Sequence, residues 1–143
     1  MECEFTNALQ RTPLWHFAFQ CYTEHQSALL HWQDQFGLAV NDLLLMAYAL
    51  RTKKSLSSGW WQRPAIQQTR VLIARVRRLR REHKNELTYA SYKKLELELE
   101  GVDLMLLSGC LGKLNHNDFV LGYEKQQGIK KGTLAPFIEK LAN

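Results

Sequence analysis

Residues 95–100 read Leu-Glu-Leu-Glu-Leu-Glu, and this stretch decides between a purely helical fold and a mixed one. A period of two is typical of a half-buried strand. Glutamate and leucine both favour helix over strand, however. The surrounding apolar residues also continue a stripe with helical spacing, namely Tyr92, Leu95, Leu99, Val102 and Leu106. We therefore predict one helix from about Glu86 to Cys110.

The helix before this one is predicted to begin at Pro64, because proline suits the first helical position, and to end at about Lys84. Its apolar positions fall near one stripe at helical pitch, formed by Ala65, Leu72, Val76 and Leu79. We expect the two long helices to pack as an antiparallel pair.

Three shorter helices are predicted before this pair, from Pro13 to about Thr23, from Ala28 to Phe36, and from about Val40 to Lys53. Thr12 and Ser27 can cap the first two of these helices, and Gly37 suits the left-handed residue that closes the second. The third carries an almost unbroken apolar run from Leu43 to Leu50, which predicts burial on most of its sides.

Glycines interrupt the C-terminal segment, where we expect short helical turns around Asp118 to Tyr123 and from Thr133 to Leu141, laid over the surface. The predicted fold is therefore all-α, a compact bundle of about five main helices with an irregular, glycine-containing C-terminal tail. We expect a single helical domain over residues 1–143, with a core at 12–110 and a tail at 111–143 packed on it.

Composition places the chain among globular proteins, since 45% of its 143 residues are hydrophobic and 23% are charged. It has no apolar stretch long enough to span a membrane, and its first residues are acidic where a secretory signal would be basic. Three cysteines without short spacing fit neither a disulfide framework nor a zinc site. We expect a cytoplasmic protein that does not bind membranes and needs neither a metal nor a cofactor.

Motifs of catalysis are missing from the sequence. Cys21 and His25 have the spacing of two ligands on one helix face, but no second pair follows, and a buried cysteine usually behaves as a small hydrophobe. We find no phosphate-binding loop, zinc-protease motif or nucleophile elbow. The sequence therefore predicts no catalytic residue, although an inter-helix pocket that binds a small ligand or substrate stays possible.

Several stretches resemble one known family. They are Leu14-Trp15 with Phe17-Ala18 and Tyr22, then Trp32-Gln33-Asp34, Gly37, Val40-Asn41 and Leu43-Leu44-Leu45, followed by a tryptophan and the arginines Arg77 and Arg78. This order is similar to a small proteobacterial family of unknown function, over about Leu14 to Cys110. The resemblance implies a bacterial, helical, intracellular protein and supplies no catalytic residues. Ala39 stands where the family has an acidic cap, so Asn41 or Asp42 is the expected cap of the third helix.

The fourth predicted helix is strongly basic, and only Glu82 opposes its cations locally: Arg70, Arg75, Arg77, Arg78, Arg80, Arg81 and Lys84. These cations could pair with Glu96, Glu100 and Asp103, which share one face of the fifth helix. They could instead form a binding surface, and the candidate residues are Arg70, Arg77, Arg78, Arg81 and Lys84.

Two adjacent tryptophans, Trp60 and Trp61, lie in the loop before the basic helix. Both could pack over helix ends, or one could stay exposed as an interaction hot spot. Together these features favour a non-enzymatic interaction protein, whose unknown protein partner docks on the basic helix and this loop. A nucleic-acid-binding accessory protein using the same arginines is the second hypothesis, and an enzyme or ligand binder with an inter-helix pocket is the third.

Overall fold

Helices make up nearly all of the regular structure in the computed structural model, which describes residues 12–112 and 118–143. The elements are α2 (Pro13–Phe36), α3 (Val40–Thr52), the 3-10 turn η1 (Trp60–Gln62), α4 (Pro64–Glu82), α5 (Tyr89–Ser108), α6 (Phe119–Gln126) and α7 (Ala135–Ala142). The described residues include no strand, only an isolated bridge between Leu56 and Leu111. The all-α prediction is confirmed, and residues 95–100 are helical.

The two helices expected before Gly37 form one continuous element, α2, with a kink inside the expected break. It is kinked at His25, which has φ −123° and ψ 23°, and Ser27 lies inside it rather than capping a new helix. The Thr23 hydroxyl donates to the carbonyl of Phe19 at 2.8 Å, so it bonds within the helix instead of ending it. The predicted ends hold, with Thr12 as the N-cap and Gly37 left-handed at φ 68°.

Helix α3 lies at the centre of the core, as its apolar run predicts. Every residue from Leu43 to Ala49 is buried, and α3 contacts α2, α5 and α7. Its N-cap is Ala39, without a side-chain hydrogen bond, which corrects the expected cap at Asn41 or Asp42. These two polar side chains lie in the first turn and bond instead to other helices.

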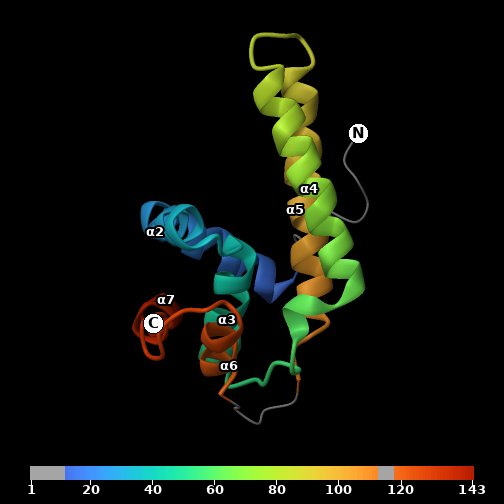
Figure 1. Cartoon of the computed structure of the whole chain (residues 1–143). Helices are drawn as coiled ribbons and strands as arrows, with labels where there is room; N and C mark the ends of the chain where they lie inside the picture. The colour runs from blue at the N-terminus through green and yellow to red at the C-terminus, as the bar shows by residue number, and fades with distance from the viewer. Residues whose placement is uncertain (1–11, 113–117) are drawn as a thin grey trace.

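Helices α4 and α5 form the expected antiparallel hairpin, which projects beyond the other helices (Figure 1). Its buried faces differ from the predicted stripes. Leu95 and Leu72 are 42% and 46% exposed. The buried residues are instead Ile66, Thr69, Ile73 and Val76 on α4, and Glu96, Asp103, Leu104 and Leu107 on α5. The difference arises because acidic side chains of α5 turn towards the arginines of α4.

The C-terminal segment forms the two short helices expected there, α6 and α7, and contributes to the core. Tyr123, Leu134 and Ile138 are almost fully buried. The carboxylate of Glu124, 1% exposed, accepts hydrogen bonds from the backbone amides of Gly132 (3.1 Å) and Leu134 (2.7 Å). A side chain of α6 thereby satisfies amide groups at the start of α7.

Replacing Glu124 with alanine should lower the free energy of unfolding by about 2 kcal/mol, because two amides lose a charged acceptor. Glu139, an exposed carboxylate on α7, is the matched control, and Glu139→Ala should change the same quantity by less than about 0.5 kcal/mol. Urea unfolding followed by circular dichroism measures both. Equal losses would show that Glu124 does not anchor α7.

Candidate functional site

A groove of about 1160 Å³ runs between α2 and the α4–α5 hairpin, with the first turn of α3 at its floor. We call it the α2–hairpin groove. Figure 1 shows α2 and the α4–α5 hairpin on opposite sides of α3. All of its lining residues lie between positions 15 and 104, so α6 and α7 contribute none.

The α2 wall is aromatic. Trp15 and Phe19, one helical turn apart, stack with ring centroids 5.2 Å apart, and Tyr22 continues the same wall. Phe19 is 61% exposed although it is a large apolar side chain. Helix α2 contains no lysine or arginine, and its charged residues are Glu24 and Asp34.

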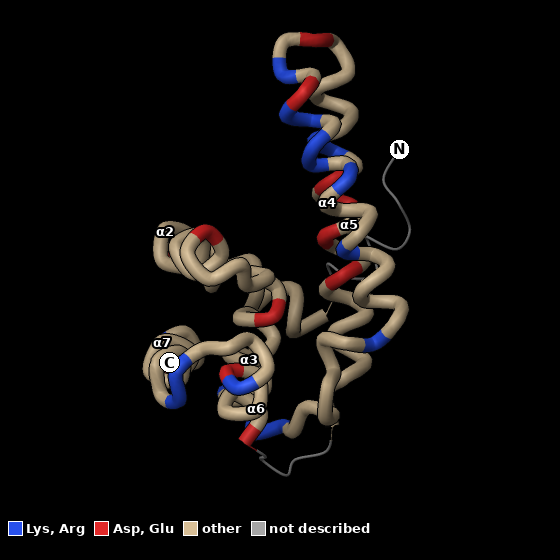
Figure 2. The backbone as a smooth tube through the Cα atoms, viewed as in Figure 1, with Lys and Arg blue, Asp and Glu red and all other residues tan. Residues whose placement is uncertain are grey.

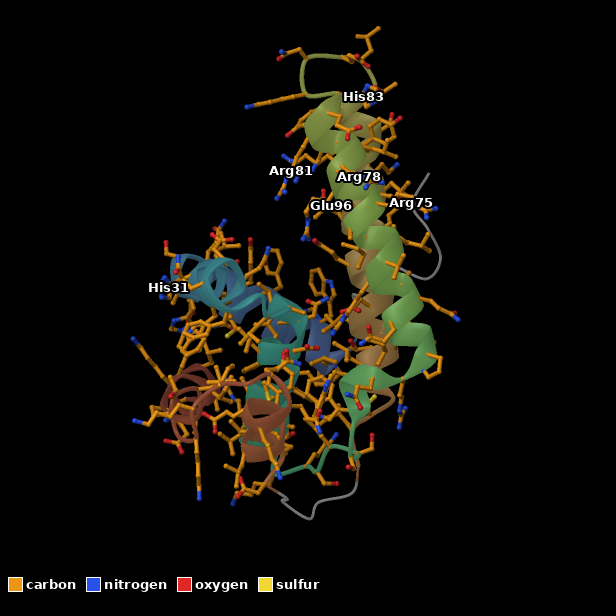
Figure 3. The ribbon with its side chains drawn as sticks, viewed as in Figure 1. His31, Arg75, Arg78, Arg81, His83 and Glu96 are labelled. Carbon is orange, nitrogen blue, oxygen red and sulfur yellow. The ribbon has the colours of Figure 1, made fainter. Side chains whose placement is uncertain are left out.

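The hairpin wall combines apolar and cationic side chains. Leu97, on α5, is 60% exposed and lines the groove, as do the exposed cations Arg81 and Lys93. Figure 3 shows Arg81 and Glu96 on the side of the hairpin that faces α2, and Arg75 on the other side. Within the described part of the chain, neither Arg81 nor Lys93 has an ion-pair partner.

The floor of the groove holds a network centred on Arg70. Its Nε donates to Asp103 at 2.9 Å and its Nη1 donates to Asp42 at 3.1 Å, while its Nη2 contacts both carboxylates. The Asn41 amide donates to Asp103 at 3.1 Å, and the Tyr123 hydroxyl donates to Asp42 at 2.8 Å. Three helices, α3, α4 and α5, therefore meet at one guanidinium group, and α6 joins the network through Asp42.

The ionisation of this network is shaped by burial. Burial raises the pKa of Asp42 against the opposing effect of Arg70. Burial and the neighbouring Asp42 carboxylate also raise the pKa of Tyr123, so the phenol stays protonated and donates its hydrogen bond. Every carboxylate oxygen of Asp42 and Asp103 accepts a hydrogen bond within the network. A saturated network of this kind holds helices together and leaves no free acid or base for catalysis.

A second set of ion pairs lies further along the hairpin. Glu96 accepts from Arg77 at 2.9 Å and from Arg80 at 2.5 Å, and Arg77 also reaches Glu100 at 3.2 Å. Burial opposes ionisation of Glu96, but the hydrogen bonds from the two arginines outweigh it and lower its pKa. Burial and the nearby Glu96 raise the pKa of Glu100. The predicted pairing of arginines with Glu96, Glu100 and Asp103 is thus confirmed for Arg70 and Arg77.

The structure separates the candidate binding residues into three groups. Arg70 and Arg77 line the groove but are engaged in ion pairs, whereas Arg81 lines it without such a partner in the described residues. Arg78 and Lys84 are exposed outside the groove.

Trp60 and Trp61 are 1% and 7% exposed, and both pack against Tyr123. This corrects the expectation that a partner docks on the tryptophan loop, because neither ring is available at the surface. The large apolar area of each ring favours burial of both in the core.

Sequence reasoning missed the aromatic wall and the role of Asp42. Trp15 and Tyr22 are seven residues apart, a spacing that is typical of the apolar, core-facing side of a helix. Phe19 lies off that face, and a large aromatic away from the core stripe is the signal that could have identified the wall. Nothing in the local sequence links Asp42 to Arg70, because they are 28 residues apart.

The spacing of Cys21 and His25 does not correspond to a metal site or an activated nucleophile in the described residues. Among residues 12–112 and 118–143, no group of three or more His, Cys, Asp or Glu side chains could hold a metal ion. Burial raises the pKa of Cys21 to about 11, so its thiol stays protonated at neutral pH and is not an activated nucleophile.

The model of one protein family matches most of this chain. The chain matches the model of a family described as a protein of unknown function, DUF2390, over residues 13–107. It belongs to that family. The DUF2390 match covers α2, α3, η1, α4 and nearly all of α5, and so contains the whole groove. Neither the curated proteins nor the solved structures include a match to this chain.

Replacing Arg70 with methionine should lower the free energy of unfolding by about 3 to 5 kcal/mol, because two buried carboxylates lose their counter-ion. Arg75 is exposed on the same helix and has no ion-pair partner among the described residues, so Arg75→Met should change stability by less than about 0.5 kcal/mol. Without Arg70, the pKa of Asp42 rises further, and the folded state takes up a proton as the pH falls. The stability deficit should therefore be smaller at about pH 5 than at about pH 8. Denaturant unfolding at both values measures it, and a deficit independent of pH would contradict this account of the network.

Proposed function

We propose that this protein is a non-enzymatic interaction module that docks a partner protein on the groove side of its α4–α5 hairpin. The observation that carries the proposal is the exposed apolar side chain of Leu97 beside the unpaired cations Arg81 and Lys93. Exposed apolar groups next to charge are typical of protein interfaces, where the apolar area supplies affinity and the charges supply specificity.

The charge distribution supports the same surface. Residues 75–94 contain eight lysines and arginines and only two acids, a net charge of +6, whereas the whole chain has +5. Figure 2 shows these cations concentrated along the projecting part of the hairpin. Arg77 and Arg80 are neutralised by Glu96 and Glu100, and the remaining cations form a positive field that attracts acidic partners.

A protein partner is favoured over nucleic acid by two features. Large apolar side chains are exposed along the hairpin, at Leu72, Leu87, Leu95 and Leu97. The unpaired arginines also do not share one face, since Arg81 faces α2 while Arg75 points the other way (Figure 3). A phosphate-tracking surface needs aligned cations and does not need exposed leucines.

We place the protein in the cytoplasm. Cys21 and Cys110 are free and buried, which is consistent with a reducing compartment. Among the helices of the described residues, none is long and apolar enough to cross a membrane.

Substituting Leu97 with glutamate should reduce recovery of the partner protein by about fivefold or more, because a charge replaces an apolar contact at the interface. Val71, on α4 outside the groove, is also 60% exposed, so Val71→Glu is the matched control and should retain recovery. Affinity isolation from the cells that express the protein, quantified by mass spectrometry, measures both variants after circular dichroism has shown that they fold.

The same isolation is repeated after nuclease treatment. Loss of the recovered material on treatment would assign the surface to nucleic acid and overturn the proposal. Equal losses from Leu97→Glu and Val71→Glu would overturn the groove as the docking surface.

A further inference from the structure

From the groove's two walls we infer that its occupant is an amphipathic helix of a partner protein, with acidic residues along the flank that meets the α4–α5 hairpin. This inference rests on the proposed function and adds the shape, charge and orientation of the bound segment.

The volume of the α2–hairpin groove is large enough for about three turns of a helix. A helix is ~10 Å across with its side chains and rises ~1.5 Å per residue, so about three turns fill a volume near 1200 Å³. The groove measures about 1160 Å³ and is bounded by helices on both sides. Helix-in-groove docking is a common form of peptide recognition, in which apolar residues at helical spacing supply the contacts.

The apolar contacts are distributed over both walls. Trp15, Phe19 and Tyr22 form the α2 wall, and Ile73 and Leu97 lie on the hairpin wall. Phe19 and Leu97 are 61% and 60% exposed, which makes them the largest unburied apolar contacts available in the groove. The bound helix must therefore present apolar residues to both walls.

The two walls carry opposite charge, and this sets the orientation of the occupant. The charged residue that lines the α2 wall is Asp34, and α2 has no lysine or arginine, whereas the hairpin wall has the unpaired cations Arg81 and Lys93. Acidic residues of the bound helix are attracted to the hairpin and repelled by α2. The groove floor adds no further charge preference, because Arg70 and Arg77 already bind carboxylates.

A second copy of the chain is a poorer occupant. Residues 75–94, in the projecting part of the hairpin, have a net charge of +6, so two copies that approach one another through this part meet like charge. An acidic partner is attracted by the same positive field. Charge complementarity therefore selects a different, acidic chain.

Designed peptides of about 15 residues, long enough for four helical turns, test the inference directly. One carries an apolar stripe flanked by glutamates, the second has the same stripe flanked by lysines, and the third has the acidic composition in scrambled order. Titration of the full-length protein, followed by fluorescence anisotropy, should give about tenfold tighter binding for the first peptide than for the other two. Nuclear magnetic resonance shifts should map the first peptide to the groove.

Arg81→Glu and Arg75→Glu are the matched variants, since both reverse one exposed arginine of α4 and change the net charge equally. Arg81→Glu should lower the affinity for the acidic peptide by about fivefold or more, whereas Arg75→Glu should leave that affinity nearly unchanged. Equal effects would show that general charge, and not the groove, attracts the peptide, and would overturn the inference.

Two further outcomes overturn it. Equal binding of the acidic and basic peptides, with partner recovery still dependent on Leu97, would leave the proposed function intact and reject the acidic helix. Sedimentation showing a dimer that Leu97→Glu dissociates would assign the groove to a second copy.

Discussion

The ion pairs that Arg70 makes with Asp42 and Asp103 are the contacts on which the position of the hairpin depends. One guanidinium on α4 binds carboxylates from α3 and α5, and Tyr123 of α6 adds a hydrogen bond to Asp42. Removing these charges from water costs roughly several kcal/mol per ion. Only a geometry in which every charged group has its partner offsets that cost. Any other angle between α3 and the hairpin would leave a buried carboxylate unpaired, so the network fixes the floor of the groove.

Ion pairing between α4 and α5 also explains why the hairpin exposes apolar side chains. Where α5 faces α4, Glu96 and Asp103 take the buried positions because arginines lie opposite them. Leucines at the neighbouring positions of the Leu-Glu repeat must then point elsewhere, and Leu95 and Leu97 do so on different sides of the helix. If leucines of the repeat packed between α4 and α5, Leu95 and Leu97 would be buried. An interface built from ion pairs leaves apolar area free for a partner.

The helix ends could be predicted where residues close in sequence determine them. The candidate site could not be predicted, because it depends on contacts between residues far apart in sequence. Thr12, Pro13 and Gly37 mark helix ends through their own backbone and side-chain properties, so these boundaries follow from the sequence. The break expected near Thr23 is present as a kink at His25, and the Thr23 hydroxyl bonds within the helix instead of ending it. The groove joins residues from four helices, and the pairing of Arg70 with Asp42 depends on tertiary packing that no local spacing encodes.

The C-terminal helices support the groove without lining it. Tyr123 reaches Asp42 beneath the floor, and its ring stacks on Trp60 with centroids 5.5 Å apart. Glu124, the next residue along the chain, anchors the start of α7. The DUF2390 match ends at residue 107, before either helix. The proposed docking surface therefore belongs to the DUF2390 segment, whereas α6 and α7 act on it through the buried network that holds its floor.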